Sequence, residues 1–143
     1  MFEYEATLDR LIDGDTIDVL IDLGFDIHIK KRVRIFGINT AESRTRDLEE
    51  KKRGLAAKAR LKELLKENGN KFQLTSHGVG KFGRCLGEIE LSVGNAGDIL
   101  VSEGHAYPYF GGNKEEAKAK AAEILAESKA AVEFARVRPE KDL

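Results

Sequence analysis

The feature that most constrains the fold is a series of short β-branched segments in the first third of the sequence. Residues 5–12 lead into an Asp-Gly turn, residues 16–21 resume the β-branched pattern, and residues 27–35 follow a second turn near Gly24. Short alternating runs joined by glycine-containing turns are typical of antiparallel hairpins. Three of them in succession predict a meander that can curl into a small barrel.

A long helix is predicted after these strands. Residues 47–68 show helical apolar periodicity, with Asp47 as the N-cap, Glu50 three residues later, and Gly69 at the end. The apolar stripe expected on this helix consists of Leu55, Ala59, Leu61, Leu64 and Leu65.

The rest of the chain alternates again between strands and helices. Strands are expected at residues 72–75 and 86–91, and further helices at residues 96–103 and 113–134. Five strands interrupted by helices predict an α+β fold: a five-stranded OB-type β-barrel with about three packed helices. Such a barrel presents one face and its loops to oligonucleotides.

At 143 residues the chain is most simply one domain, with residues 1–135 in the fold and residues 136–143 as a frayed tail. No apolar run approaches the length of a membrane span, so no membrane partner is expected. The only cysteine is Cys85, so no disulfide-linked partner is expected, and we expect a monomer. The N-terminus lacks the pattern of a secretory signal, which indicates a cytoplasmic protein as written; a secreted mature form is left open.

Charge is distributed unevenly although the net charge is only −1. Residues 1–29 carry one basic against eight acidic side chains, residues 30–84 carry sixteen against six, and residues 85–143 carry seven against eleven. The positive middle segment can steer a polyanion to one face. For any single lysine in it, an ordinary solvated surface position is an equally good interpretation.

Three clusters in the sequence combine the groups that cut a phosphodiester. They are Asp-Gly-Asp-Thr at 13–16, Arg-Ile-Phe-Gly-Ile-Asn-Thr-Ala-Glu at 34–42, and Lys-Phe-Gly-Arg at 81–84. Hydrolysis with one metal needs a cation on the phosphate, an oriented water, and positive charge for the transition state. Carboxylate, amide and carbonyl oxygens with two guanidinium groups supply that inventory.

The clusters resemble those of the staphylococcal nuclease, or thermonuclease, family, over about residues 5–131. The resemblance implies that Asp15 binds the metal with Asn39 and with the backbone carbonyl of Thr40. It implies Glu42 as the general base. Whether Glu42 takes the proton or only orders the water stays open.

Two arginines correspond to the phosphate-binding arginines of that family: Arg34, five residues before Asn39, and Arg84. Both also suit ordinary surface positions, one on the polar face of a strand and one at a hairpin. A guanidinium can hold two phosphate oxygens at once, which a lysine ammonium cannot.

The chain departs from the family pattern at three positions: Asn39 replaces Asp, Ala41 replaces Pro, and Phe82 replaces Tyr. Hard oxygen donors suit calcium or magnesium, and the resemblance favours Ca²⁺, with Mg²⁺ possible. Because Asn39 removes a negative charge, weaker metal binding is predicted. The three histidines, at positions 28, 77 and 105, show no zinc-ligand spacing.

Further substrate contacts are predicted from residues near these clusters. Lys81 is expected near a terminal phosphate. Phe82 is predicted as a substrate contact that keeps the ring of the family's tyrosine but lacks its hydroxyl. The run Tyr-Pro-Tyr-Phe at 107–110, with Tyr107 and Tyr109 as the named contacts, can form a stacking platform for bases. Packing against the last helix explains it nearly as well. The Gly78–Gly83 match to a dinucleotide-binding fingerprint is set aside because a strand, not a helix, is expected after it.

The sequence therefore predicts a phosphodiester hydrolase, a metal-dependent (calcium) nuclease cutting DNA, RNA or both with low sequence specificity. By resemblance, water attacks the phosphorus in line and the 5′ oxygen leaves, which gives 3′-phosphate ends. The alternative is a non-catalytic OB-type module that binds single strands or a protein partner, an interpretation that the Asn39 replacement keeps open.

Overall fold

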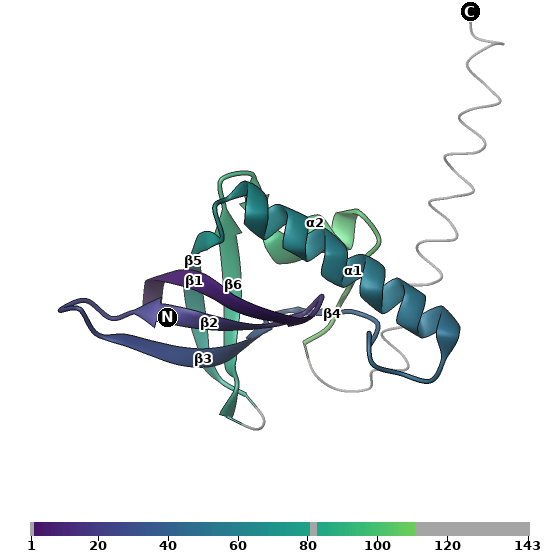
Figure 1. Cartoon of the computed structure of the whole chain (residues 1–143), viewed down its shortest axis with the longest axis horizontal. Helices are drawn as coiled ribbons and strands as arrows, with labels where there is room; N and C mark the ends of the chain where they lie inside the picture. The colour runs from purple at the N-terminus through teal and green to yellow at the C-terminus, as the bar shows by residue number, and fades with distance from the viewer. Residues whose placement is uncertain (1, 81–82, 111–143) are drawn as a thin grey trace, which may run out of the picture. The chain divides into compact units, whose positions relative to one another are not determined.

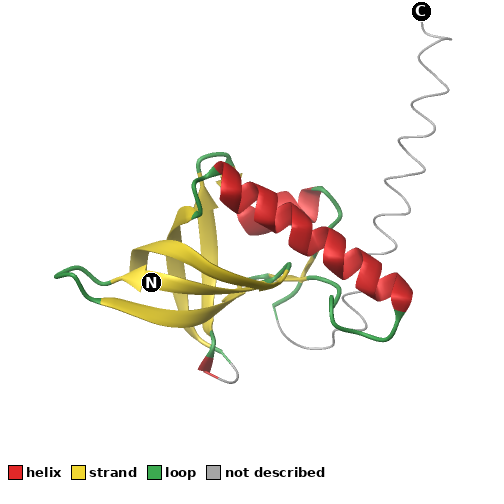
Figure 2. Cartoon of the chain, viewed as in Figure 1, coloured by secondary structure: helices red, strands yellow, loops and turns green. Residues whose placement is uncertain are grey.

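The computed structural model describes residues 2–80 and 83–110 of the chain. Its strands are β1 (Phe2–Asp13), β2 (Thr16–Asp22), β3 (His28–Ile35), β4 (Ile38–Asn39), β5 (Lys71–Val79), β6 (Cys85–Leu91), β7 (Gly94–Asn95) and β8 (Tyr107–Pro108). Its helices are α1 (Leu48–Glu67) and α2 (Ala96–Ser102). Figure 2 shows both helices on the same side of the strands.

Five strands close into a barrel, as predicted (Figure 1). They follow the order β3-β2-β1-β5-β6 through antiparallel neighbours, and a parallel pairing of β3 with β6 completes the circle. In that pairing Val33 lies opposite Cys85 and Ile35 lies opposite Gly87. The arrangement confirms the OB-type α+β fold.

The barrel interior is filled by alternate side chains of these strands. Ile17, Val33, Leu74 and Ile89 are each fully buried, which follows from the period-two alternation of a strand with one face on a core. Burying side chains of this size stabilises the fold by roughly 1.5–3 kcal/mol each. The strands are therefore rigid supports for the loops at their ends.

The N-cap of α1 is as predicted. Asp47 accepts hydrogen bonds at its carboxylate from the backbone N–H groups of Glu49 and Glu50, at 3.0 and 3.3 Å. The predicted apolar stripe, however, is wrong at Leu55 and Ala59, which are exposed. The buried face consists of Gly54, Ala57, Leu61, Leu64 and Leu65.

The reason for this difference lies in the first half of α1, which packs closely against two loops. A Cβ on Gly54 would lie 2.5 Å from the backbone carbonyl carbon of Glu42, and one on Gly14 would lie 2.7 Å from the Ala57 Cβ. Only small residues fit at such distances, so the leucine at position 55 is turned outward. Apolar periodicity alone does not detect a face built from glycine and alanine.

Several expected elements differ from the structure or lie beyond its described part. The strand expected at 72–75 is longer and contains Gly78. The β4–β8 pair was not predicted, because two-residue strands have no detectable periodicity. The helix expected at 113–134 lies outside the described residues, so two of the expected helices are observed, and the 1–135 domain boundary stays a prediction.

Candidate functional site

Asp15 immediately precedes β2 and follows the Asp-Gly turn, so its carboxylate lies at one end of the barrel. It is 7% exposed and accepts three contacts. Oδ1 accepts a hydrogen bond from the Thr16 hydroxyl at 2.9 Å, and Oδ2 accepts one from the Thr40 backbone N–H at 3.0 Å. The third contact is an ion pair of 3.4 Å between Oδ2 and Nη1 of Arg34.

Arg34 joins the first cluster to the second. It lies at the end of β3, directly opposite Thr16 in the β2–β3 ladder. Its Nη2 donates to the Asn39 side-chain oxygen at 2.7 Å, while Nη1 also faces the carbonyl of Ile35 at 3.3 Å. The side chain is 12% exposed, so the guanidinium is held in one orientation rather than solvated.

The side chain of Asn39 connects two partners from different elements. Its Oδ1 accepts from Arg34, and its Nδ2 donates to the hydroxyl of Tyr107. Because β4 pairs with β8, Asn39 and Tyr107 lie directly opposite each other. Tyr107 therefore has a hydrogen-bonding role in addition to the stacking role predicted for it.

The oxygen atoms of this site are of the type that binds a hard divalent cation. They are the Asp15 carboxylate, the Asn39 amide oxygen and the oxygens of Thr40, whose buried Oγ1 has no hydrogen-bond partner in the described part of the chain. Within residues 2–80 and 83–110 there is no cluster of three or more histidine, cysteine or acidic side chains. Such a site would carry the charge of a single carboxylate, which favours weak binding.

Glu42 is exposed, but the loop that carries it is tightly held. The next residue, Ser43, is 4% exposed and donates both its hydroxyl and its backbone N–H to Asp13, the latter at 3.2 Å. On the other side, the missing side chain of Gly54 lets α1 contact the Glu42 backbone. A carboxylate on such a loop can meet solvent water while its backbone stays in place.

Arg84 reaches the same part of the barrel through strand pairing. It immediately precedes β6, whose first residue, Cys85, lies opposite Val33, the neighbour of Arg34. Its side chain is partly exposed.

The structure thus brings Asp15, Arg34, Asn39, Thr40 and Tyr107 into direct contact. It places Glu42 on the adjoining loop, and Tyr109 beside Gly37, whose carbonyl accepts the Tyr109 N–H at 2.8 Å. Lys81 and Phe82 lie outside the described residues.

Sequence reasoning missed two residues that hold the site together, Ser43 and Gly54. Neither residue belongs to a recognisable motif. Ser43 acts through its contact with Asp13, and Gly54 acts through its contact with the Glu42 backbone. In each case the partner is distant in sequence.

Outside the site, the strongest electrostatic effects belong to surface ion pairs. A bidentate hydrogen bond from Arg32 lowers the pKa of the Asp18 carboxyl, and one from Arg60 lowers the pKa of the Glu103 carboxyl. Both pairs are structural links, one between β2 and β3 and the other between α1 and the end of α2. Neither described helix has the length and apolarity needed to span a membrane.

The family comparison assigns most of the chain to one domain family. The family model for staphylococcal nuclease homologues matches residues 32–134, which include Arg34, Asn39, Glu42 and Arg84. Asp15 precedes the matched segment, yet it directly contacts Arg34. A search of curated proteins finds no match. The match extends over most of the sequence, and the chain therefore belongs to the staphylococcal nuclease homologue family, a family of nuclease or nucleic-acid-binding domains.

Proposed function

We propose that this protein is a metal-dependent nuclease that hydrolyses phosphodiester bonds in DNA, RNA or both with little sequence specificity. The observation that carries the proposal is the contact of Asp15 with Arg34 beside the loop that carries Glu42. A buried carboxylate, an oriented guanidinium and an exposed second carboxylate at one barrel end are the groups such a reaction requires.

In the proposed reaction, Glu42 accepts a hydrogen bond from the attacking water, either taking its proton or orienting it. Arg34 and Arg84 contact phosphate oxygens and stabilise the negative charge that develops on them. Asp15, Asn39 and Thr40 are the residues that would hold Ca²⁺ or Mg²⁺. When bound, such a cation polarises the phosphate.

The positive segment of the chain supports a polyanionic substrate. Residues 30–84 carry sixteen basic against six acidic side chains and include β3, α1 and both arginines. Electrostatic attraction of this kind is independent of base sequence, which agrees with low specificity.

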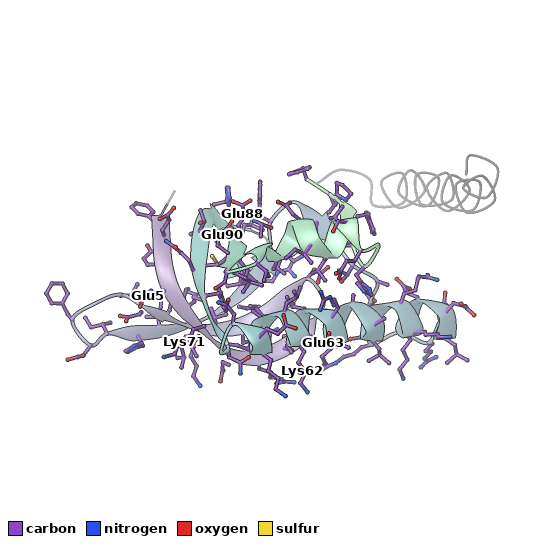
Figure 3. All side chains as sticks on the ribbon, turned by 90° about the horizontal axis from the view of Figure 1, so that it is seen from above. Glu5, Lys62, Glu63, Lys71, Glu88 and Glu90 are labelled. Carbon is purple, nitrogen blue, oxygen red and sulfur yellow. The ribbon has the colours of Figure 1, made fainter. Side chains whose placement is uncertain are left out.

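The matched variants Glu42→Gln and Glu5→Gln test the proposal. Glu5 lies on β1 and, like Glu42, is exposed (Figure 3). Single-stranded and duplex DNA and RNA are incubated with each protein in calcium, magnesium or chelator. We expect degradation that chelator abolishes and that Glu42→Gln lowers by about 100-fold or more, with Glu5→Gln equal to the wild type.

A second candidate function is a binding module without turnover. The neutral side chain of Asn39 favours it, because Asp15 is then the one carboxylate among the three candidate metal ligands. That module would bind strands in a salt-sensitive way and degrade none with any metal. Folded protein with that behaviour would replace the nuclease proposal.

A further inference from the structure

Three aromatic rings form a contiguous surface at the edge of the candidate site. The Phe36 ring stacks on the imidazole of His77, with centroids 4.1 Å apart and planes at 8°. Phe110 meets Phe36 edge to face, with centroids 5.6 Å apart and planes at 71°. Both arrangements are among those that aromatic pairs prefer.

Phe110 is the ring that this surface presents to solvent. It is 76% exposed, yet it is held in place from beneath. A Cβ on Gly37, which has a φ of +81°, would lie 3.0 Å from the Phe110 ring, so only glycine lets the ring rest on this turn. The hydrogen bond from Tyr109 to Gly37 fixes the adjoining backbone.

The base of the stack is fixed as well. The His77 Nε2 lies 2.8 Å from a carboxylate oxygen of Glu88, which projects from β6 (Figure 3). That hydrogen bond sets the plane of the imidazole, and the imidazole in turn supports Phe36. An exposed ring with two supporting layers is pre-organised for a flat ligand, because little conformational freedom remains to be lost on binding.

Backbone pairing connects the segments that carry these rings to the candidate site. Asn39 lies opposite Tyr107, and the Tyr109 N–H donates to the carbonyl of Gly37. Phe36 follows Arg34 by two residues, and Phe110 follows Tyr107, the partner of Asn39, by three. The proposed phosphate position at Arg34 and the aromatic rings therefore belong to neighbouring segments of the chain.

We propose that Phe110, supported by Phe36 and His77, is a stacking position for an unpaired base of a single-stranded nucleic acid. This inference rests on the proposed function for the position of the phosphate. Bases in a duplex already stack on their neighbours, whereas every unpaired base has a free π-face that an aromatic ring can bind. The position therefore selects single strands over duplexes without selecting a base.

The test distinguishes binding to the base from binding to the phosphates. Binding of a fluorescent single-stranded DNA oligonucleotide is measured in chelator, so that no cleavage interferes, beside the same strand with abasic residues at its centre. We expect Phe110→Ala to weaken binding of the normal strand by about fivefold or more and to leave the abasic strand unchanged. We expect Phe110→Trp, which keeps an aromatic ring at this position, to bind the normal strand like the wild type.

Phe25→Ala is the matched control, since Phe25 is 97% exposed at the distant tip of the β2–β3 hairpin. It is expected to bind both strands like the wild type. Equal weakening of the two strands by Phe110→Ala, or no weakening of either, overturns the inference. The same holds if the wild type binds no single strand, or if Phe110→Ala alters self-association instead.

Failure of the proposed function gives a different result. A protein that binds the normal strand through Phe110 but degrades nothing in any metal retains the stacking position and is not a nuclease. If the protein degrades strands and neither binding nor degradation depends on Phe110, it is a nuclease that lacks the proposed stacking position.

Discussion

The two ends of the β2–β3 hairpin differ in how their side chains are covered. At its base, Thr16 lies opposite Arg34, and the buried Asp15–Arg34 pair connects to the 39–43 loop. At its tip, Asp22 lies opposite His28, and the turn beyond exposes Leu23, Phe25 and Ile27 to solvent. Figure 1 shows this tip projecting away from the helices.

The strands are the same at both ends, so strand pattern does not decide which end carries a polar network. The difference lies in what covers each end. Ala57 and Gly54 of α1 pack against the base through Gly14 and the Glu42 backbone. Within the described residues, the backbone hydrogen bonds at the tip are those of its own turn, in which the Leu23 N–H donates to Ile27 and the Ile27 N–H donates to Gly24, both at 2.9 Å.

The largest expected effect comes from exchanging an aspartate for asparagine at each end. Asp15→Asn removes the charge that faces Arg34, so we expect turnover to fall by about 100-fold or more and stability by on the order of 2 kcal/mol. Asp26→Asn at the tip, where φ is +60°, replaces a residue with one that tolerates this conformation and should change neither.

Steady-state degradation rates and urea denaturation measure the two effects of this pair. Equal behaviour of the two variants would mean that the base of the hairpin has no special role.

The next largest effect is expected from a substitution that pushes α1 away from the base of the β2–β3 hairpin. Gly54→Ala should stabilise an isolated helix, yet here the new methyl group meets the Glu42 backbone. We expect a loss of roughly 1–3 kcal/mol in urea denaturation and reduced turnover, because the loop must move. Ala56→Gly, at an exposed position of the same helix, reports helix propensity alone. A more stable Gly54→Ala protein would contradict the close packing.

The smallest effect concerns the link that joins α1 to α2. The Arg60 hydrogen bonds lower the pKa of the Glu103 carboxyl in the folded chain, so the unfolded chain binds this proton more readily. The stabilisation is therefore complete above the ordinary glutamate pKa and is lost as pH falls through the folded value.

Glu103→Gln should accordingly lower the urea midpoint slightly at pH 7 and less at pH 3. Glu67→Gln, exposed at the end of α1, should change it equally at both. A loss that does not depend on pH would assign the effect to packing.

Much of the architecture was predictable because it rests on local patterns. Turn glycines, β-branched alternation and the Asp47 cap identified the five barrel strands and α1. The motif resemblance assigned Asp15 and Arg34 to one site, but their ion pair was not predicted. What failed was the face of α1, where Leu55 is exposed and Gly54 buried, because small residues in close contact leave no hydrophobic signal.

The supporting contacts of the site were likewise beyond sequence reasoning. Ser43 meets Asp13 from thirty positions away, and His77 meets Phe36 across the barrel edge. Contacts between distant segments depend on register and loop path, which single-sequence patterns do not encode.

The parallel β3–β6 closure has a consequence for how the protein folds. Asp15 and Arg34 belong to one hairpin with a short turn, whereas Val33 and Cys85 are 52 positions apart. Closing a long loop carries a larger entropic cost than forming a local hairpin, so we expect the hairpin to form first. Pulsed hydrogen exchange during refolding should then protect β2 amides before the Phe36 amide, which donates to the Gly87 carbonyl across the closure. The reverse order would contradict this folding order. The half of the site that holds Asp15 would be complete before Arg84 arrives.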